Sequence, residues 1–334
     1  PAQSGRMSSP PPSSRSVVVW VLAQPGDESL DVLDPAPEGT RLVVDAEPEE
    51  FDGAPPPDVV VDCVSGPARV AGGVARAPDL EWFHSRSAGL EGVLVPELVA
   101  SPAVVTNGRG AFSHSLAEFV VAALLFFVKD LRRLVRRQEE GLWDPEDMEM
   151  LHGHTLGIVG YGDVGRATAA LLRPLGLKVL ALRRRPELSA DDPLVDEVLP
   201  VERLGELMAR ADDVVVAAPL TPETRGLVDA GALAAMKPTG VLVNVGRGPV
   251  VDEGALIEAL ERGTIRGAAL DVFETEPLPE GHPFWRLPNV LLSPHCADHV
   301  PGWIQDGTRV FLENLARFQR GEPLRNVVDK TRGY

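Results

Sequence analysis

Short apolar runs alternate with amphipathic segments through the second half of the chain. The runs are continuous, and the segments between them carry apolar residues at helical spacing. Continuous apolar strands joined by helices are typical of a parallel sheet that is covered on both faces. The predicted strands are Thr155–Val159, Val179–Leu182, Val214–Ala217, Val241–Val243, Ala268–Leu270 and Val290–Leu292. The predicted helices are Arg166–Leu172, Glu202–Arg210, Ala230–Met236 and Glu253–Arg262, with a shorter piece near Pro283–Arg286.

The first part of the chain carries a weaker pattern of the same kind. Acidic and proline-rich loops separate its apolar runs, and the helical signal between them is faint. This pattern predicts a small open α/β domain. Its expected strands are Val17–Leu22, Leu42–Val44, Val59–Val61 and Trp82–His84, and the late helix Val310–Arg320 is expected to return to it.

One long helix is predicted over Ser115–Arg137. Ser115 and Glu118 have the spacing of a capping box, in which each side chain binds the other residue's backbone N–H. The first half of this helix is apolar on nearly all sides, so more than one surface must cover it. A neighbouring domain or a second subunit would serve, and a homodimer is expected.

Composition narrows the class of protein. The chain has 334 residues, which suits two domains, and a net charge of −17, which argues against nucleic acid or an anionic membrane as partner. Cys63 and Cys296 are its only cysteines, so no disulfide framework is implied. No apolar run has the length of a membrane span. We therefore expect a soluble intracellular protein, cytoplasmic, or organellar if the tail is a transit-peptide remnant.

Residues 1–16 form a segment rich in Pro and Ser. Such a segment cannot bury enough apolar surface to order itself, so we expect a disordered tail. Whether Pro1–Arg6 are native, with Met7 as the natural start, stays open.

The run from Thr155 to Leu172 contains a glycine motif in its required strand–turn–helix setting. In G-x-G-x-x-G, the first Gly allows a tight turn, the second admits a pyrophosphate, and the third lets the helix pack on the strand. The helix N-terminus then offers N–H groups and the positive end of its dipole to the phosphates. The motif is Gly160, Tyr161, Gly162, Asp163, Val164 and Gly165. It predicts a dinucleotide site.

Arginines follow the second strand of this domain. NAD sites place Asp or Glu about 20 residues after the glycines, where the acid accepts from the ribose 2′-hydroxyl. Here Arg183 and Arg184 stand at the tip of the strand instead, and their guanidinium groups suit a 2′-phosphate. NADP(H) is therefore favoured, and NAD(H) stays possible.

Chemically useful side chains follow the later strands as well. Arg247 comes after the fourth strand, Asp271 and Glu276 after the fifth, and His295 after the sixth. Because the carboxyl ends of parallel strands meet at one edge of a sheet, these groups are expected to converge where the dinucleotide would lie.

The chain resembles the D-isomer-specific 2-hydroxyacid dehydrogenases, the group that includes glyoxylate/hydroxypyruvate reductases and phosphoglycerate dehydrogenase. The match runs in order and spacing from about Ser115 to His295, and before that it rests on SAGLE and TNGRG. The matching pieces are SLAEF, LGIVGYGDVGRA, APLTPETRGLV, MKPTGVLVNVGRGPVVDEGALIEAL, GAALDVFETEPLP and HPFWRLPNVLLSPH.

The resemblance implies two Rossmann-like α/β domains. A doubly wound parallel sheet that binds the dinucleotide, residues 113–299, would be inserted in a flavodoxin-like substrate domain, residues 17–112 and 300–334. The implied activity is NADPH-dependent reduction of a small 2-oxo acid, such as glyoxylate or hydroxypyruvate, to the D-2-hydroxy acid.

The resemblance places the catalytic roles on Arg247, Glu276 and His295, and the chemistry of these side chains agrees. Arg247 can bind the substrate carboxylate and carbonyl oxygen through its planar fork. His295 would be the acid in reduction and the base in oxidation, and Glu276 would orient its ring.

Other roles are implied by the resemblance alone. Ala88 and Gly89 would offer backbone N–H groups to the substrate carboxylate, and Asp271 would hold the nicotinamide carboxamide. Pro219 and Thr224 would line the adenosine half, and Val245 and Gly246 the nicotinamide ribose.

One stretch departs from the family pattern. Cys296-Ala297-Asp298-His299 follows His295 where a small apolar run is usual, so Asp298 or His299 could tune the site. His152 and His154 lie just before the first strand of this domain; two histidines do not make a metal site without carboxylate partners, and none is expected.

Two alternative functions stay open. One is a formate- or phosphite-dehydrogenase-like enzyme, although Glu276 argues against the formate type, which pairs its histidine with an amide. The other is a nucleotide-sensing scaffold similar to the C-terminal-binding-protein co-repressors.

Overall fold

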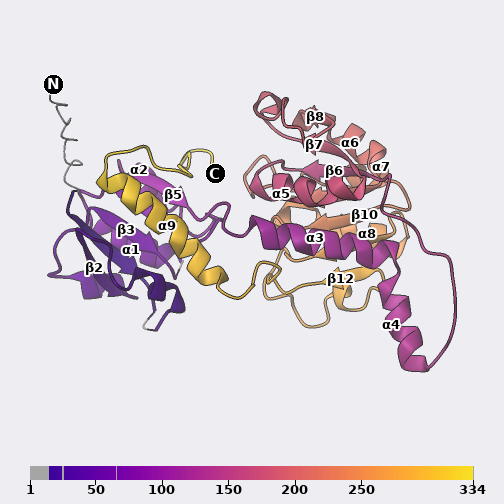
Figure 1. The fold of residues 1–334 in the computed structure, drawn as a ribbon, viewed down its shortest axis with the longest axis horizontal. Coiled ribbons are helices and arrows are strands. Elements are labelled where there is room, and N and C mark those ends of the chain that lie inside the picture. The colour runs from indigo at the N-terminus through magenta and orange to yellow at the C-terminus, as the bar shows by residue number, and fades with distance from the viewer. Residues whose placement is uncertain (1–14, 25, 65, 334) are drawn as a thin grey trace, which may run out of the picture. The chain divides into compact units, whose positions relative to one another are not determined.

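The computed structural model describes residues 15–24, 26–64 and 66–333, which form two compact units (Figure 1). One unit contains the described residues up to Ala111 and those from Ile304 onward. The other is the continuous segment Phe112–Trp303. The aromatic rings of its first and last residues, Phe112 and Trp303, have their centroids 6.2 Å apart. Each unit is built on a parallel sheet, which confirms the predicted fold class.

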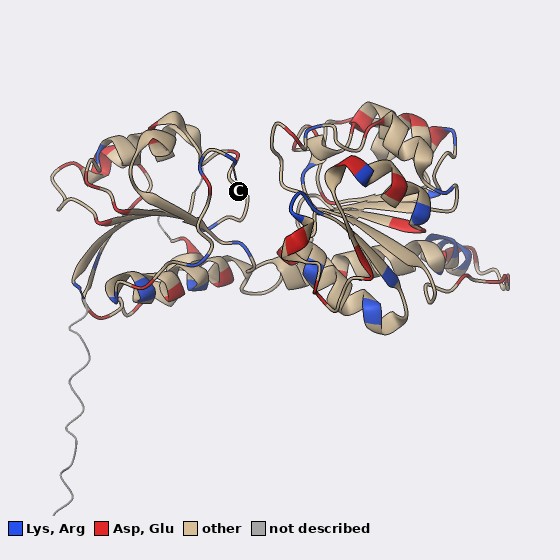
Figure 2. Cartoon of the chain, turned by 90° about the horizontal axis from the view of Figure 1, so that it is seen from above, with Lys and Arg blue, Asp and Glu red and all other residues tan. Residues whose placement is uncertain are grey.

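The predicted N-terminal tail falls largely on residues 1–14, outside the described part of the chain. Arg15 is described and has defined partners. Its backbone N–H donates to the Gln319 carbonyl oxygen at 3.2 Å, and its guanidinium pairs with Asp58 at 2.6 Å. Charged residues of both signs gather on the helices and loops around the two sheets (Figure 2).

The first unit contains a five-stranded sheet in the order β2-β1-β3-β4-β5. This is the strand order of flavodoxin-like folds. The strands are β1 (Val17–Leu22), β2 (Thr40–Asp45), β3 (Val59–Asp62), β4 (Trp82–Ser85) and β5 (Val104–Asn107). The helical segments are η1 (Glu28–Leu33), η2 (Pro48–Phe51), α1 (Pro67–Ala75), α2 (Pro96–Ala100) and α9 (Trp303–Gln319).

Helices cover both faces of this sheet. Val70 of α1 and Leu98 of α2 pack with Phe83 on one face. On the other face Phe311 of α9 stacks on Trp82, with ring centroids 5.2 Å apart. The predicted helix at residues 310–320 is therefore the second half of a longer helix that belongs to this unit.

The second unit contains a seven-stranded parallel sheet in the order β12-β11-β10-β9-β6-β7-β8. Its strands are β6 (Thr155–Val159), β7 (Lys178–Leu182), β8 (Glu197–Leu199), β9 (Asp213–Val216), β10 (Val241–Asn244), β11 (Gly267–Leu270) and β12 (Val290–Leu292). The chain order reverses direction between β6 and β9. Doubly wound folds bind their ligands at such a switch point.

The helices of this unit are divided between the two faces of its sheet. They are α3 (Ser113–Val128), α4 (Leu131–Glu140), α5 (Asp163–Leu172), α6 (Leu204–Arg210), α7 (Ala230–Ala235) and α8 (Glu253–Glu261). Short 3₁₀ segments are η3 (Arg173–Leu175), η4 (Pro186–Leu188), η5 (Val201–Arg203), η6 (Gly248–Val250) and η7 (Pro283–Trp285).

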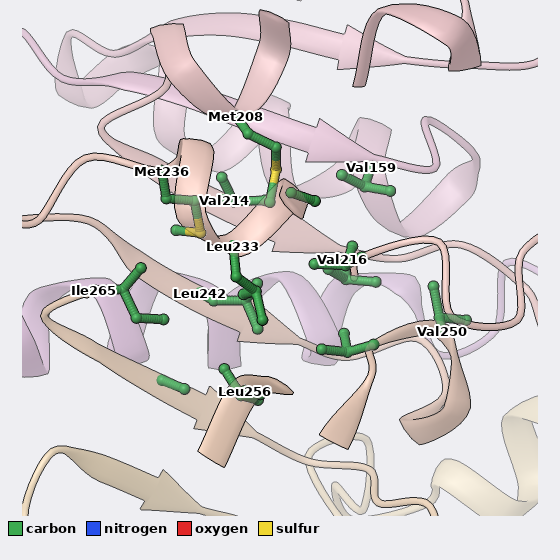
Figure 3. Close-up of a cluster of buried hydrophobic side chains, with 14 of the residues drawn as sticks. Val159, Met208, Val214, Val216, Leu233, Met236, Leu242, Val250, Leu256 and Ile265 are labelled. Carbon is green, nitrogen blue, oxygen red and sulfur yellow. The ribbon is translucent and has the colours of Figure 1, made fainter. Parts of the chain in front are cut away.

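Alternate strand residues feed two separate cores. On one face, Met208 of α6, Leu233 of α7 and Leu256 of α8 surround Val214 and Leu242 of the sheet (Figure 3). On the other face, the helices α3 and α5 pack on the remaining strand side chains. Helices therefore bury both faces of the sheet, as the continuous apolar strands predict.

The predicted helix Ser115–Arg137 is wrong as a single element. Asp130 adopts a left-handed backbone, with φ at 44°, and separates α3 from α4. The predicted capping box is also wrong, because α3 begins earlier and its N-cap is Phe112. Ser115 instead donates its hydroxyl to the Ala297 carbonyl oxygen at 2.7 Å. That bond ties the helix to the loop after His295.

Within the described residues, no helix combines the length and apolarity needed to cross a bilayer.

A histidine–aspartate pair closes the amino-terminal edge of the larger sheet. His154 Nδ1 lies 2.9 Å from Asp213 Oδ2, and Asp213 Oδ1 accepts from the Val241 N–H at 3.2 Å. The hydrogen bond with Asp213 raises the pKa of His154 above its ordinary value of 6.5. A raised pKa in the folded state stabilises the protein below the unfolded-state pKa, and that contribution is lost as pH rises through the folded-state value.

We expect His154→Asn to cost more stability in acid than in base. The loss in free energy of unfolding should be larger at about pH 6 than at about pH 9, by roughly 1 kcal/mol. Urea unfolding at both values measures it. His114→Asn, at an exposed histidine, is the control. Equal losses at both pH values would show that the His154 charge contributes nothing.

Candidate active site

The glycine turn between β6 and α5 has the backbone that a dinucleotide site requires. Gly160 has φ at 95°, and a Cβ placed on it would lie 2.5 Å from the Ala218 nitrogen. A Cβ on Gly165 would lie 2.9 Å from Ile158 Cγ2, so helix and strand pack closely there. A Cβ on Gly162 would meet nothing within 4 Å. The turn is thus fixed on two sides and open at the helix N-terminus, which fits a pyrophosphate.

The side chains of the glycine turn are held by the segment after β7. Tyr161 is buried, and this burial is the main reason that the pKa of its hydroxyl is raised. The hydroxyl donates to Asp192 Oδ2 at 3.3 Å. Arg166 Nε donates to the same oxygen at 2.8 Å. Burial of Asp192 is outweighed by the Leu194 N–H bond and the Arg166 bond, so its pKa is lowered. Asp163 and Val164 form the first turn of α5.

Arg183 is the first residue after β7, at the position where NAD sites carry an acid. Its guanidinium is half-buried and donates to the Ser189 hydroxyl. Arg184 is exposed and lies close to Glu223. Hydrogen bonding to Thr221, with a smaller contribution from the Arg184 charge, lowers the pKa of Glu223. Two cations therefore stand at the tip of this strand.

The loops after β9 and β10 meet beside the switch point. Thr224 Oγ1 donates to the Pro219 carbonyl oxygen at 2.6 Å and closes the first loop. The Val245 N–H donates to the Val216 carbonyl oxygen at 3.0 Å. A Cβ on Gly246 would lie 2.7 Å from the Ala218 carbonyl oxygen, so the two loops are in backbone contact.

His295 and Glu276 form a hydrogen-bonded pair. His295 Nδ1 lies 2.6 Å from Glu276 Oε2, and the two side chains are 44% and 34% exposed. The second oxygen, Glu276 Oε1, accepts from the Phe273 N–H at 2.9 Å. The hydrogen-bonded pair of His295 and Glu276 is thus partly open to solvent, while the backbone N–H of Phe273 holds the carboxylate. Such an arrangement orients the ring for proton transfer at Nε2.

Asp271 holds the backbone that carries His295. The His295 N–H donates to the Asp271 carbonyl oxygen at 2.9 Å. Asp271 Oδ1 accepts from the N–H groups of Cys296 and Ala297, each at 3.0 Å. His295 itself has φ at 50°, in the left-handed region. These bonds fix the loop in a backbone conformation that a non-glycine residue rarely adopts.

Arg247 lies on the loop that touches the Glu276 segment. A Cβ on Gly248 would lie 2.0 Å from the Phe273 carbonyl carbon, so the two loops are in direct contact there. The Arg247 Nη1 group donates to the Gly246 carbonyl oxygen at 2.7 Å. Arg247, Glu276 and His295 therefore follow three strands, β10, β11 and β12, that are neighbours in the sheet.

Ala88 and Gly89 lie in the first unit, in the loop after β4. Asn107 Nδ2 donates to the Ala88 carbonyl oxygen at 2.7 Å, and the Gly108 N–H donates to the Ser87 carbonyl oxygen at 3.1 Å. The carbonyl groups of Ser87 and Ala88 are thus held by the end of β5 and the residue after it, which fixes the backbone of this loop.

The residues after His295 occupy defined places. Burial raises the pKa of Asp298, and the His299 ring stacks on Trp303 at 4.0 Å between centroids.

His152 Nδ1 lies 3.2 Å from the Leu175 carbonyl oxygen. Among the described residues, no group of three or more His, Cys, Asp or Glu side chains is arranged to hold a metal ion.

Several supporting residues were missed by sequence reasoning. Asn244 Oδ1 accepts from the Gly246 N–H and its Nδ2 donates to the Arg247 carbonyl oxygen, both at 3.1 Å. Its position at the tip of a strand, beside Arg247, was a usable signal. Asp192 and Ser189 lie in a loop without any motif. The side-chain partners of Asp192, Tyr161 and Arg166, are distant in sequence, whereas Ser189 binds Arg183 within the same loop.

Comparison with known proteins agrees with this geometry. Residues 121–297 match the model of the D-isomer specific 2-hydroxyacid dehydrogenase NAD binding domain. The chain is 35% identical over 266 residues to a glyoxylate reductase of Thermofilum pendens, covering 76% of each chain. It is 36% identical over 263 residues to a glyoxylate reductase of Korarchaeum cryptofilum, covering 76% of this chain and 77% of that one.

Solved structures show the same relationship. A D-isomer specific 2-hydroxyacid dehydrogenase of Xanthobacter autotrophicus, in complex with NADPH and MES, is 32% identical with a TM-score of 0.82, covering 96% of this chain and 100% of that one. An NADPH-dependent glyoxylate/hydroxypyruvate reductase of Sinorhizobium meliloti, in complex with NADP and sulfate, is 28% identical with a TM-score of 0.81, covering 95% and 100%. The chain belongs to the D-isomer specific 2-hydroxyacid dehydrogenase family and is an NAD(P)-dependent oxidoreductase.

Proposed function

We propose that this enzyme uses NADPH to reduce a small 2-oxo acid, of the glyoxylate or hydroxypyruvate kind, to the D-2-hydroxy acid. The observation that carries the proposal is the hydrogen-bonded pair of His295 and Glu276. Glu276 follows β11, which lies between β12, before His295, and β10, before Arg247. This is a proton donor and a carboxylate-binding cation at the ligand-binding edge of a dinucleotide fold.

The side chains divide the work of the reaction. When bound, the nicotinamide cofactor supplies the hydride that the carbonyl carbon receives. Arg247 binds the substrate carboxylate and carbonyl oxygen and stabilises the negative charge that develops on that oxygen. His295 donates a proton from Nε2 to the same oxygen, and Glu276 holds the ring through Nδ1. The substrate gains one hydride and one proton and becomes a hydroxy acid.

The remaining residues hold the two ligands in this proposal. Gly160–Gly165 and Arg183 with Arg184 bind the phosphates of the cofactor. Pro219 and Thr224 line the adenosine half, and Val245, Gly246 and Asp271 line the nicotinamide half. Ala88 and Gly89 bind the substrate carboxylate with their N–H groups, which the family resemblance favours.

Arg183→Ala should weaken NADPH binding about 10-fold to 100-fold and leave NADH binding nearly unchanged. The reason is the loss of a charge-assisted hydrogen bond that only the 2′-phosphate can accept. Fluorescence titration of both cofactors measures it. Arg185→Ala removes the same charge at the exposed neighbouring arginine and is the control. An unchanged ratio of the two dissociation constants would contradict the 2′-phosphate assignment.

A steady-state assay with NADPH and NADH against a panel of 2-oxo acids tests the function. Glyoxylate and hydroxypyruvate should be reduced, with NADPH preferred. Turnover of formate or phosphite would favour the related dehydrogenases. Binding of NADPH without turnover of any acid would favour a nucleotide-sensing scaffold.

A homodimer is the proposed assembly. The segment from α4 onward exposes large apolar side chains that a monomer would leave in water, among them Val135, 55% exposed, and Trp143, 97% exposed. Light scattering at micromolar concentration should give twice the chain mass. A monomer that retains full activity would exclude the proposal.

A further inference from the structure

We propose that Glu253 and His282 are positioning residues for Glu276, and through it for the imidazole of His295. The inference rests on the proposed function, because it concerns the same acid–base pair. Neither residue follows a strand end, and neither touches His295. They act on the short turn that carries Glu276.

Glu253 binds this turn directly. It is the first residue of α8, after the N-cap Asp252, so its backbone is fixed by the helix. Its Oε2 accepts from the Glu274 N–H at 3.1 Å, and its Oε1 lies 3.1 Å from His282 Nε2. Glu253 and His282 side chains are only 17% and 15% exposed. Both carboxylate oxygens are therefore engaged in a site with little water.

The proton on His282 has a defined place. The Phe284 N–H donates to His282 Nδ1 at 3.4 Å, so Nδ1 is an acceptor. In the neutral ring the proton must then sit on Nε2, where it donates to Glu253. The ring also packs against Phe284, with centroids 4.9 Å apart. His282 thus fixes the rotamer of Glu253 from behind.

Consecutive backbone N–H groups link this pair to Glu276. The Phe273 N–H donates to Glu276 Oε1 at 2.9 Å, and the next N–H, of Glu274, donates to Glu253. Loss of the Glu274 bond is therefore expected to disturb the peptide next to the one whose N–H binds Glu276. The turn has little room to adjust, because Gly248 contacts the Phe273 peptide. The pocket that Glu253, Gly248 and Phe284 help to line measures only about 10 Å³.

Two substitutions of His282 separate positioning from helix capping. Asn places an oxygen near Nδ1 and keeps the cap for Phe284, but it does not reach Glu253. Gln places an N–H₂ near Nε2 and keeps the donor for Glu253, but it caps poorly. If His282 acts through Glu253, His282→Asn lowers kcat about 10-fold to 100-fold and His282→Gln restores most of it.

The same series includes Glu253 and a matched control. Glu253→Gln faces the His282 donor and the Glu274 donor with one acceptor oxygen, so we expect a loss of kcat like that of His282→Asn. KM for NADPH should change less than about 2-fold, because the glycine turn is untouched. Glu258→Gln makes the same change on the same helix, at an exposed residue paired with Arg262, and should behave as wild type.

A double-mutant cycle locates the effect. In a Glu276→Gln background, adding Glu253→Gln should cost less than about 2-fold further in kcat, because the residue through which it acts is already removed. Full additivity of the two losses would place the action of Glu253 elsewhere and overturn the proposal.

A spectroscopic readout does not depend on turnover. The His295 Nδ1–H proton, in its short hydrogen bond to Glu276, should give a protected downfield signal in ¹⁵N-edited NMR of wild type and His282→Gln. The signal should broaden or move upfield in His282→Asn and Glu253→Gln, and be lost in Glu276→Gln. Unchanged spectra in His282→Asn and Glu253→Gln would overturn the inference. A lower activity of His282→Gln than of His282→Asn would overturn it as well. Wild-type enzyme inactive on every 2-oxo acid would instead overturn the proposed function, and the spectra would still decide this one.

Discussion

Replacing His295 with Asn should lower kcat for 2-oxo acid reduction by about 10²-fold to 10⁴-fold. Asn cannot deliver a proton from the position of Nε2, so the carbonyl oxygen would have to take its proton from water. The NADPH dissociation constant should stay within about 2-fold of the wild-type value, because the proposed phosphate site, the glycine turn, is a different loop. Single-turnover reduction and fluorescence titration measure the two quantities separately.

His299→Asn is the matched control for this prediction. His299 lies on the same segment but stacks on Trp303 rather than pairing with Glu276. It should retain kcat within a few fold. Equal losses at positions 295 and 299 would indicate a general distortion of the loop and would argue against proton transfer by His295.

Arg247→Gln should have the second large effect, on kcat and KM together. Loss of a donor aimed at the developing oxyanion costs about 10²-fold to 10³-fold in kcat. Loss of the charged hydrogen bonds to the substrate carboxylate adds about 10-fold to 100-fold in the KM of the 2-oxo acid. Steady-state kinetics with glyoxylate, at saturating NADPH, resolve both.

Arg247→Lys tests the planar fork itself. Lys keeps the charge but cannot bind two oxygen atoms in parallel, so kcat should recover only in part. Arg262→Gln removes an exposed arginine of the same unit and should leave both constants unchanged. Full activity in Arg247→Lys would show that charge alone suffices and that no bidentate grip is used.

Local patterns predicted much of the fold. The strand–turn–helix at residues 155–172 could be predicted from its own residues, although the close approach of Gly160 to Ala218 involves a residue 58 positions away. The gathering of residues after β10, β11 and β12 followed from parallel strands alone. The pairing of His295 with Glu276, 19 positions apart, was expected from the family resemblance, and strand order alone placed both residues at the same edge of the sheet.

Contacts between distant segments were beyond such patterns. The Ser115 hydroxyl suited a helix cap by spacing, yet it binds a carbonyl group 182 positions away. The break between α3 and α4 at Asp130 contains no Pro or Gly that would have predicted it. Glu253 and His282 are 29 positions apart, and only the packing of α8 against the turn at residues 273–276 brings them together. The supporting residues are set by tertiary contacts, whereas the residues proposed to perform the chemistry follow strand ends.

The rings of Phe112 and Trp303 lie side by side at the two ends of the larger unit. A domain whose first and last residues lie close together can be inserted into another domain, because the receiving chain does not have to separate at the insertion point. The boundaries of this unit fall at the start of α3 and at the first residue of α9, outside every strand. Exchange of this unit for another nucleotide-binding unit would therefore leave every strand of the receiving sheet intact.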